Sequence, residues 1–329
     1  MSEGAVLITG GTGLIGANVA RSVLERGLRP IIFDMKPVYE NIADIEDKVV
    51  VERGDVGDLG DLADACRRHG VDRVLHLAAV MSIQAALKPS KSTVTNCIGT
   101  SNIFHLAQLF DFKRVVYASS AAVYGKKPFY QKTFGRHVVT EDDPPMPYDV
   151  YGSMKYLCEG LGAQAIRDGV DVVGLRPVMT FGFGRLDGAV GILNKAMRDA
   201  ALEGRGVVTR PWQADTMINP MYAKDAADLF VSTLLADKKL KRPVYNLGTG
   251  EYLSIRGMMD LAEKSLSSNQ HIDFDDVPPS EGGGKDPPSF DYPDLDSTAI
   301  RSELNWTARY GFEGGAAECI DMYRRIGQG

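Results

Sequence analysis

Short apolar runs alternate with helical patterns through the first half of this 329-residue sequence. The runs cover Ala5–Thr9, Pro30–Phe33, Lys48–Val51, Arg73–Ala79, Arg114–Ser119 and Asp171–Pro177. Two of the helical segments between them, Leu14–Gly27 and Asp61–Gly70, end in a glycine, where helices commonly stop. Strands that are apolar on both faces and alternate with helices form parallel sheets covered on both sides. The pattern therefore predicts an α/β fold with a doubly wound parallel sheet.

The pattern loosens after Pro177. Further helical patterns occur at Gly188–Gly204, at Ala223–Lys239, around Leu304 and around Ile320. A stretch rich in Pro and Gly, Val277–Asp296, is predicted to form a long loop. We therefore expect a first domain over residues 1–177, which contains the sheet. A smaller C-terminal lobe is expected over residues 178–329, and part of it returns to the sheet.

Composition narrows the classes of protein to which the chain can belong. An apolar fraction of 44% can build a full core, and no strongly basic stretch offsets the net charge of −6, which argues against a nucleic-acid partner. The four cysteines lie far apart and lack the paired spacing of a metal site, so we expect no metal and a reducing compartment. No apolar run approaches the roughly 20 residues that cross a bilayer, and the first strand begins too early for a signal peptide. We expect a soluble, cytoplasmic protein with no membrane partner.

The first predicted strand runs directly into the sequence TGGTGLIG. Gly10 would permit a tight turn, Gly13 would let backbone approach a pyrophosphate, and Gly16 would let the helix pack closely on the strand. A glycine pattern alone is weak, but this one follows a strand and opens a helix. It predicts a dinucleotide-binding site that includes Leu14 and Ile15 at the start of the helix. The alternative is a merely tight turn between strand and helix.

Asp34 closes the second predicted strand. A carboxylate at that place can accept hydrogen bonds from both ribose hydroxyls of an adenosine and repels a 2′-phosphate. No arginine stands beside it in the sequence, although Lys36 is close. Asp34 therefore favours NAD over NADP, and the alternative is an ordinary loop carboxylate.

The third and fourth predicted strands are followed by GDV (Gly54–Val56) and HLAAV (His76–Val80). Small side chains in the second motif would let a cofactor lie flat against backbone. His76 is interpreted as a hydrogen-bonded strand residue rather than a catalyst, because its two neighbours point to the opposite face. The cofactor-binding residues expected here are Asp55, Val56, Leu77, Ala78 and Ala79.

These motifs resemble those of the extended short-chain dehydrogenases/reductases, the NAD-dependent epimerase/dehydratase family. The resemblance covers nearly the whole chain, because the remaining motifs also follow in the family's order. These are TNCIGT around Asn96, ASSAAVYG (Ala118–Gly125), YGSMK (Tyr151–Lys155), LRP (Leu175–Pro177) and a C-terminal LDSTAIRSELNW. The resemblance implies an enzyme with NAD as its cofactor. It also implies a Rossmann-type NAD-binding domain over residues 1–177 and a substrate-binding lobe after it.

Tyr151 and Lys155 are four residues apart, so on a helix they lie on one face. A phenol has a pKa of about 10 and is a poor base at neutral pH, whereas a nearby ammonium favours the phenolate. The resemblance implies that Tyr151 is the general acid/base and that Lys155 assists it and binds the nicotinamide ribose. The alternative is a solvated turn of helix, because this spacing is common by chance.

The resemblance also assigns roles to residues near the ends of other strands. Ser120 would hydrogen-bond the reacting oxygen of the substrate and stabilise charge on it. Ser119 is the alternative, because adjacent strand residues point to opposite faces. Asn96, counted with the cofactor-binding residues, is expected to hold backbone rather than touch substrate. Pro177 and Val178 are expected to border the nicotinamide.

Departures from the family's motifs bear on the substrate. The family's dehydratases carry an Asp-Glu pair where this chain has Ala121 and Ala122, which cannot transfer protons, so a sugar dehydratase is not expected. Many members that bind nucleotide sugars carry an arginine at the position of Ile218. The cations that could replace it are Arg185, Arg210 and Lys285, and none of them matches the motif.

The leading hypothesis is an NAD-dependent oxidoreductase that acts at a secondary alcohol or ketone of a small, polar, sugar-derived substrate. The alternative is a nucleotide-sugar epimerase, which uses the same residues and keeps its NAD tightly bound. A third hypothesis, an NAD-binding protein without turnover, is disfavoured by the intact set of Ser120, Tyr151 and Lys155.

The resemblance further implies a homodimer. Its interface would be formed by the helix that carries Tyr151 and by a helix over about residues 92–110, and two-fold symmetry is the commonest closed arrangement. The candidate apolar contacts are Leu157, Leu161, Ile103 and Leu106, some of which must instead cover the sheet.

Overall fold

The computed structural model describes residues 4–186, 188–275 and 292–327. Within them the main sheet has seven parallel strands in the order β12-β7-β5-β4-β1-β2-β3. The strands are β1 (Ala5–Thr9), β2 (Arg29–Asp34), β3 (Val50–Arg53), β4 (Val71–His76), β5 (Arg114–Ala118), β7 (Val172–Pro177) and β12 (Val244–Leu247). The strand order runs outward in both directions from β1, which places the switch point between β1 and β4. The doubly wound α/β fold predicted from the sequence is confirmed.

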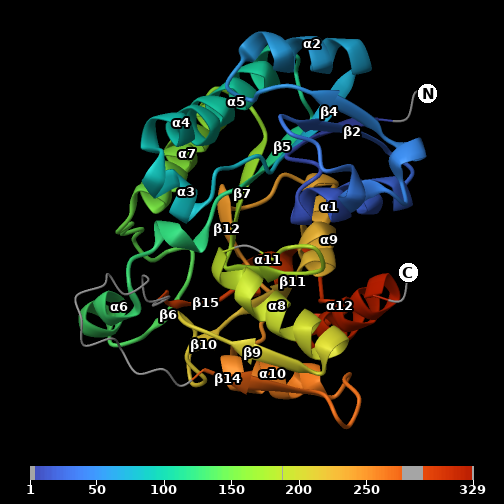
Figure 1. Cartoon of the computed structure of the whole chain (residues 1–329). Helices are drawn as coiled ribbons and strands as arrows, with labels where there is room; N and C mark the ends of the chain where they lie inside the picture. The colour runs from blue at the N-terminus through green and yellow to red at the C-terminus, as the bar shows by residue number, and fades with distance from the viewer. Residues whose placement is uncertain (1–3, 187, 276–291, 328–329) are drawn as a thin grey trace.

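Helices cover both faces of this sheet (Figure 1). On one face, α1 (Leu14–Glu25) packs against α9 (Ala223–Leu234), and their apolar side chains share a core with the sheet. On the other face, α2 (Leu59–His69), α5 (Gly99–Leu109) and α7 (Val150–Arg167) form a second core with it. Burial on both faces explains why the strands are almost continuously apolar.

Most predicted elements are present, although several end elsewhere. The ends of β3 and β4 are shifted by two or three residues from the predicted runs, and β12 has no counterpart among those runs. The helix predicted to reach Lys239 ends at Leu234. Arg114 of β5 donates hydrogen bonds to the carbonyls of Thr233, Ala236 and Lys238. These bonds hold the segment after Leu234 in a non-helical course.

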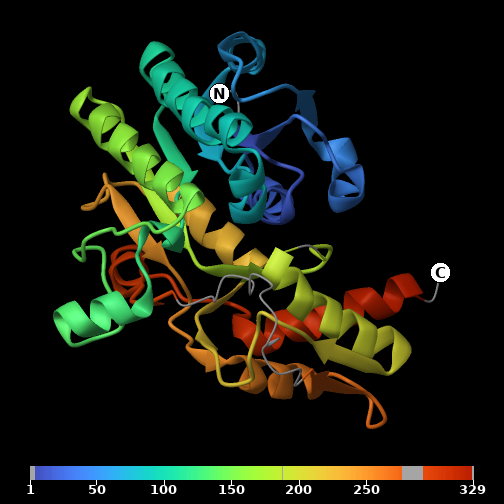
Figure 2. The ribbon, with the colours of Figure 1, turned by 60° about the vertical axis from the view of Figure 1, so that its left-hand side comes forward.

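The helix expected over residues 92–110 has an interruption. It consists of α4 (Pro89–Thr93), a π-helical turn (Val94–Ile98) and α5, joined end to end. Turns of this kind commonly occur near functional sites. Figure 2 shows α5 and α7 side by side along one flank of the sheet, and the two helices are in contact.

The structure narrows the candidate apolar contacts of the homodimer. Ile103 and Leu106 are the candidates that cover the sheet instead, because both are fully buried between α5 and the sheet. Leu161 is half-buried against the same core, whereas 53% of Leu157 is exposed. Helical spacing showed which residues share a face, but apolar character alone did not show which face the sheet would cover.

The C-terminal lobe has a core of its own, formed largely by α8 (Gly188–Glu203), α10 (Ile255–Glu263) and α12 (Gly311–Gly327). Its short strands form three pairs: β8 (Met179–Phe181) with β11 (Pro220–Tyr222), β9 (Arg205–Val208) with β14 (His271–Phe274), and β10 (Met217–Ile218) with β13 (Leu253–Ser254). A fourth pair joins β15 (Asp294–Leu295) of the lobe to β6 (Val138–Val139) of the first 177 residues. The other α-helices described are α3 (Ser82–Leu87), α6 (Lys127–Phe134) and α11 (Thr298–Leu304). Much of the predicted loop Val277–Asp296 lies outside the described residues. No described helix is long and apolar enough to cross a membrane.

Candidate active site

Two glycines shape the loop that joins β1 to α1. Gly10 has a φ of +65°, in the left-handed region, and a Cβ there would lie 2.9 Å from the Ala78 backbone. A Cβ on Gly16 would overlap the carbonyl oxygen of Gly10, so α1 can pack this closely on the strand end only without a side chain. Both contacts agree with the roles expected of these glycines in a dinucleotide-binding turn.

Gly13 leaves the start of α1 open to a ligand. It is the N-cap residue, so it offers no side chain to the N–H groups of the first turn, where Leu14 and Ile15 lie. A Cβ added at Gly13 would meet only the Gly10 carbonyl oxygen within 4 Å, at 3.2 Å. Unpaired N–H groups at a helix start bind anions. This part of the chain therefore fits the pyrophosphate of a dinucleotide.

Asp34 lies at the carboxyl end of β2, beside this loop. Its Oδ2 accepts hydrogen bonds from the Thr12 hydroxyl at 2.7 Å and from the Thr12 backbone N–H at 3.2 Å. The register of the sheet pairs Asp34 with Arg53 of β3, a neighbouring cation that the local sequence did not reveal. Asp34 is thus held against the glycine loop, where a carboxylate can meet the adenosine ribose of NAD.

Thr9, at the end of β1, organises the end of β4. Its hydroxyl oxygen accepts hydrogen bonds from the backbone N–H groups of Leu77 and Ala78, so its proton is donated to Nδ1 of His76, at 2.7 Å. Nε2 of His76 then donates to the Thr100 hydroxyl, at 3.0 Å. Burial lowers the pKa of His76 to about 3, and the nearby charge of Lys155 acts in the same direction. His76 is a neutral, hydrogen-bonded strand residue, as expected.

The other expected cofactor-binding residues also follow the strands. Oδ1 of Asp55 accepts a hydrogen bond from Gly57 N–H at 2.9 Å, and Val56 is buried under α5. Ala79 is half-buried just beyond β4. The Asn96 side chain accepts a hydrogen bond from the backbone N–H of Val80 at 2.7 Å and donates one to the Val80 carbonyl at 2.9 Å. The π-helical turn thereby fixes the segment after β4.

Tyr151 and Lys155 lie on one face of α7, as their spacing predicts. The helix starts at the N-cap Asp149, whose carboxylate accepts a hydrogen bond from Gly152 N–H at 2.6 Å. Tyr151 is 5% exposed and Lys155 is 4% exposed. The Lys155 Nζ lies 5.8 Å from the centroid of the Tyr151 ring and donates a hydrogen bond to the Ala118 carbonyl at 2.6 Å. The ammonium is therefore held between the end of β5 and the phenol.

The two serines after β5 point to different partners. Ser119 is buried, and its hydroxyl donates to the Glu159 carboxylate at 2.6 Å. Ser120 is half-buried, and its Oγ accepts a hydrogen bond from Ala122 N–H at 3.1 Å. Tyr151 packs on Ala122. The Ser119 hydroxyl is thus paired with Glu159, whereas Ser120 begins the turn that contains Ala122, the neighbour of Tyr151.

Two residues that the sequence did not suggest also contact Tyr151. The phenol hydroxyl lies 3.7 Å from Sδ of Met81, which precedes α3. Tyr292 packs against the cluster of Tyr151, Ala85 and Ala122, and burial raises its pKa. Tyr292 is distant in the sequence and belongs to none of the motifs, so only the folded chain shows its position.

The residues expected around the nicotinamide and the substrate lie further along the chain. Pro177 ends β7, and Val178 lies between β7 and β8, where it packs against the core of the C-terminal lobe. Arg185 lies between β8 and α8, and Arg210 lies after β9, both in connecting segments. The expected alternative cation, Lys285, lies outside the described residues. Ile218 is buried in β10, so this position offers no charge to a diphosphate.

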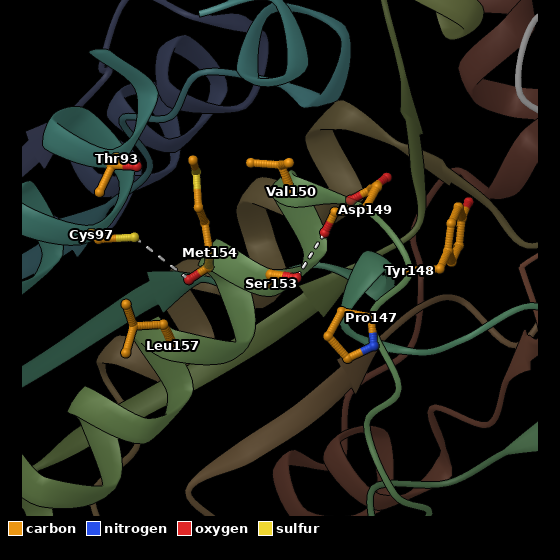
Figure 3. A pocket seen from close by; sticks show the side chains of 9 residues that line it. All are labelled: Thr93, Cys97, Pro147, Tyr148, Asp149, Val150, Ser153, Met154 and Leu157. Carbon is orange, nitrogen blue, oxygen red and sulfur yellow. Dashed lines mark hydrogen bonds between the residues drawn. The ribbon is translucent and has the colours of Figure 1, made fainter. Parts of the chain in front are cut away.

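A hollow of about 540 Å³ lies on the outer side of α7. Figure 3 shows side chains from the first half of α7 and from α4 and the π-helical turn around it; they include Val150, Met154, Leu157, Thr93 and Cys97. Tyr151 and Lys155 do not line this hollow. It is therefore separate from the proposed catalytic groups, although the same helix carries both.

Comparison with known proteins gives consistent matches. A model of the NAD dependent epimerase/dehydratase family matches residues 6–248. UDP-glucose 4-epimerase from Lactobacillus helveticus is 27% identical over 326 residues, which cover 93% of this chain and 92% of that protein. The structure of UDP-glucose 4-epimerase from Thermotoga maritima has a TM-score of 0.81 at 21% identity and covers 98% of this chain and 99% of its own. L-threonine dehydrogenase from Clostridium difficile has a TM-score of 0.83 at 22% identity, over 100% of both chains. The two structural matches show the fold, which an epimerase and a dehydrogenase share.

Proposed function

The chain belongs to the NAD-dependent epimerase/dehydratase family, and from this premise we propose that it oxidises a secondary alcohol, or reduces the corresponding ketone, on a small polar substrate derived from a sugar. It is an NAD-dependent enzyme of the extended short-chain dehydrogenase type. The proposal is supported by the position of Tyr151 and Lys155 beside the end of β5, next to the turn that Ser120 begins.

The residues that would hold NAD are those of the strand ends. The first turn of α1 would face the pyrophosphate, Asp34 the adenosine ribose, and Lys155 the nicotinamide ribose. Pro177 and Val178 would border the nicotinamide. When bound, NAD supplies the acceptor for the hydride that leaves the substrate carbon.

The side chains of the proposed site would manage the proton and the charge on the substrate oxygen. In the oxidising direction, the phenolate of Tyr151 takes the proton of the substrate hydroxyl, and the Ser120 hydroxyl donates a hydrogen bond to the same oxygen. The ammonium of Lys155 favours the phenolate before the proton arrives. In the reducing direction Tyr151 returns the proton.

The C-terminal lobe supports a small substrate over a nucleotide sugar. Its β10 carries the buried Ile218 where many family members that bind nucleotide sugars place an arginine. The two alanines after Ser120 are also buried and can transfer no proton, which argues against a dehydratase. Arg185 and Arg210 are the proposed cations for a polar or acidic group of the substrate.

A nucleotide-sugar 4-epimerase is the second candidate. The named relatives at 25–27% identity, UDP-arabinose and UDP-glucose 4-epimerases, favour it. The same three side chains could serve it, because an epimerase removes a hydride and returns it to the opposite face. The two functions differ in whether NAD leaves the enzyme after each turnover.

Release of the cofactor separates the two candidates. The purified protein is denatured, and NAD is measured in the supernatant. Near-stoichiometric NAD supports the epimerase. Little NAD, together with NADH formation in a screen of polyols and sugar acids, supports the dehydrogenase. Epimerisation of UDP-glucose without net NADH would overturn the leading proposal.

The role of Tyr151 is tested by its replacement with phenylalanine, which removes only the phenolic oxygen. Turnover should fall by roughly 10²–10⁴-fold, the loss expected for a positioned acid/base. NAD affinity, measured by titration calorimetry, should stay close to that of the wild type because the ring is kept. Near-normal turnover by this variant would refute the catalytic role of Tyr151.

A homodimer through α5 and α7 is also part of the proposal. The outward faces of α7 and of the π-helical turn with α5 carry exposed apolar side chains, which are Val94, Ile98, Leu109, Tyr156 and Leu157. The hollow beside α7 lies on the same flank and could receive side chains of a second copy. Two such helix pairs would form a four-helix interface with two-fold symmetry.

Light scattering tests this interface. We expect a dimer at micromolar concentration. Replacing Ile98 and Leu157 by aspartate should give a monomer, because it would place like charges in an apolar contact. As a matched control, aspartate at the exposed Leu202 of α8 should leave the dimer intact. A monomeric wild-type protein would contradict the proposal.

Two coarser assignments complete the proposal. Residues 1–177 are taken as the NAD-binding domain and residues 178–329 as mainly the substrate lobe, although α9 and β12 of the second part pack with the sheet. A cytoplasmic location is supported by the four cysteines, all of which are free and buried. Fractionation of cells that produce the protein tests the location.

A further inference from the structure

A buried ion pair lies directly behind the proposed catalytic groups. Glu159 comes one helical turn after Lys155, on the same face of α7, and is 7% exposed. Arg176, in β7, is 4% exposed and donates hydrogen bonds to both carboxylate oxygens of Glu159, each at 2.7 Å. Neither residue belongs to the acid/base set described above.

This pair connects the segments that carry the proposed site. Glu159 also accepts the hydrogen bond of the Ser119 hydroxyl, at 2.6 Å, and Ser119 immediately precedes Ser120. Arg176 also donates to the Tyr124 hydroxyl at 2.5 Å and lies over the Tyr124 ring, just after the turn that Ser120 begins. The catalytic helix, the end of β5 and the end of β7 therefore meet at one carboxylate.

The charges of the pair also bear on Lys155. The ammonium of Lys155 binds the carbonyl of Ala118, and the carboxylate of Glu159 binds the side chain of the next residue, Ser119. Without Arg176, the carboxylate of Glu159 would attract the Lys155 ammonium away from the phenol. Replacing a buried ion pair by apolar side chains is often neutral or stabilising, so stability alone does not account for this one.

We propose that Glu159 and Arg176 are positioning residues of the active site. Glu159 holds the strand end that carries Ser120 against α7. Arg176 neutralises Glu159, so that the charge of Lys155 acts on Tyr151. The inference rests on the proposed role of Tyr151 and assigns to neither residue a contact with substrate.

Other titratable groups also lie around Lys155 and Tyr151. His76 of β4 faces Lys155 and is neutral. The thiols of Cys97 and Cys158 also lie near Lys155, and their mutual hydrogen bond raises the pKa of Cys97 and lowers the pKa of Cys158 to about 6. Tyr292 lies beside Tyr151, and burial raises its pKa, as does its hydrogen bond with Tyr148 near Asp149. The ion pair differs from these groups in that both of its members carry a charge, whose balance a substitution can change.

The first test is a pH titration of the NAD complex, which needs no substrate, and the kinetic measurements that accompany it use the substrate found by screening. The ultraviolet absorbance of tyrosinate is measured in the NAD complex, and the curve of Tyr151→Phe is subtracted to isolate Tyr151. In Glu159→Gln, the hydrogen bond from Ser119 is kept, but the positive charge of Arg176 loses its partner. The midpoint of the Tyr151 ionisation should fall by about 0.5–1 pH unit, and the acid limb of kcat should shift with it.

Two further variants separate charge from geometry. In the double variant Glu159→Gln with Arg176→Met, both charges are gone, so the midpoint should return to the wild-type value while kcat stays lowered several-fold at unchanged KM. Ser119→Ala removes only the link to the strand end, so it should lower kcat without any shift in the midpoint. A merely structural pair would lower stability in all three variants and move none of the midpoints.

The outcomes are distinguishable from failure of the proposed function. If Tyr151→Phe retains turnover, the catalytic role of Tyr151 fails, whatever the ion pair does. If Tyr151→Phe is inactive but Glu159→Gln titrates like the wild type, the inference is overturned. Should Glu159→Gln not fold, the double variant and Arg176→Lys decide. The inference is supported if the double variant has a lowered kcat with the wild-type midpoint and KM, and if Arg176→Lys recovers kcat. An unchanged kcat in the double variant rejects it.

Discussion

The cofactor half and the C-terminal lobe hold their proposed functional residues in different ways. In the first half these residues stand at the ends of paired strands or on the helices that follow, as Asp34 does at the end of β2 and Tyr151 does on α7. In the lobe, the proposed substrate cations Arg185 and Arg210 stand in connecting segments between short elements. The first arrangement is set by local geometry that many family members can share. The second can change from one member to the next without altering the sheet.

This difference predicts that variants should separate into two groups. Substitutions in the glycine loop and at the strand ends should change cofactor affinity or chemistry for every substrate. Substitutions in the lobe should change KM for a particular substrate and leave NAD binding unaltered. The predictions below test this separation, starting with the largest expected effect.

Lys155→Met should have the largest effect, because it removes both the ammonium that favours the phenolate and a proposed contact to the nicotinamide ribose. Turnover should fall by roughly 10²–10⁴-fold, with a loss of NAD affinity as well. Steady-state kinetics and NAD titration measure the two effects. Lys195→Met, at an exposed position of α8, is the matched control and should change neither. Full NAD affinity in Lys155→Met would contradict the ribose contact.

Gly16→Ala should weaken NAD binding by roughly 10–100-fold, because overpacking of this kind typically costs about 1–3 kcal/mol and here displaces the loop that meets the pyrophosphate. The new Cβ would overlap the Gly10 carbonyl oxygen, which is backbone and cannot rotate away. In the lobe, a Cβ on Gly314 of α12 would make only ordinary contacts, the nearest at 3.5 Å from Tyr310. Gly314→Ala should therefore bind NAD like the wild type. Equal NAD affinities in the two variants would argue that the close packing of α1 does not matter for the cofactor.

The same contrast explains how much the sequence could predict. The glycines and Asp34 were identifiable because each acts within a few residues of its strand, where spacing along the chain determines position. Glu159 was visible as a residue four positions after Lys155, but its partner Arg176 comes from another strand, and only the sheet brings the two together. Tyr292 packs from far along the chain against the cluster that contains Tyr151, so no local pattern predicts its position.

Two outcomes that the sequence did not decide have related physical causes. Ile103 and Leu106 were candidates either for dimer contacts or for the cover of the sheet, and the sheet covers them. An apolar helix face looks the same in sequence whether it meets a sheet or a second copy. The helix that ends at Leu234 was predicted to be five residues longer. Hydrogen bonds from Arg114 accompany its end, and Arg114 lies in β5, so the local sequence does not contain this contact. In both cases a tertiary contact decided what helical periodicity left open.

Asp34→Ser should shift the cofactor preference toward NADP by roughly tenfold, through weaker NAD binding and tighter NADP binding. The carboxylate that repels a 2′-phosphate is removed, while Arg53 on the neighbouring strand and Lys36 remain to attract it. Titration of both cofactors into both proteins measures the ratio. Tighter binding of NADP than of NAD by the wild type would contradict the role of Asp34.

Arg185→Ala and Arg210→Ala should have the smallest effects, and these should be confined to the substrate. Each removes a cation from a connecting segment of the lobe, so KM for a polar or acidic substrate should rise about three- to tenfold, the loss of one charged contact. The turnover number and NAD affinity should not change, since the glycine loop, Asp34 and Lys155 are untouched. Arg198→Ala is the matched control, because Arg198 lies on α8 of the same lobe and pairs with Asp199. If one of the two variants instead loses NAD affinity, the separation between cofactor half and lobe fails at that residue. If KM is unchanged in both variants with the substrate found by screening, that substrate is bound by other groups and the two arginines belong to the structure of the lobe alone.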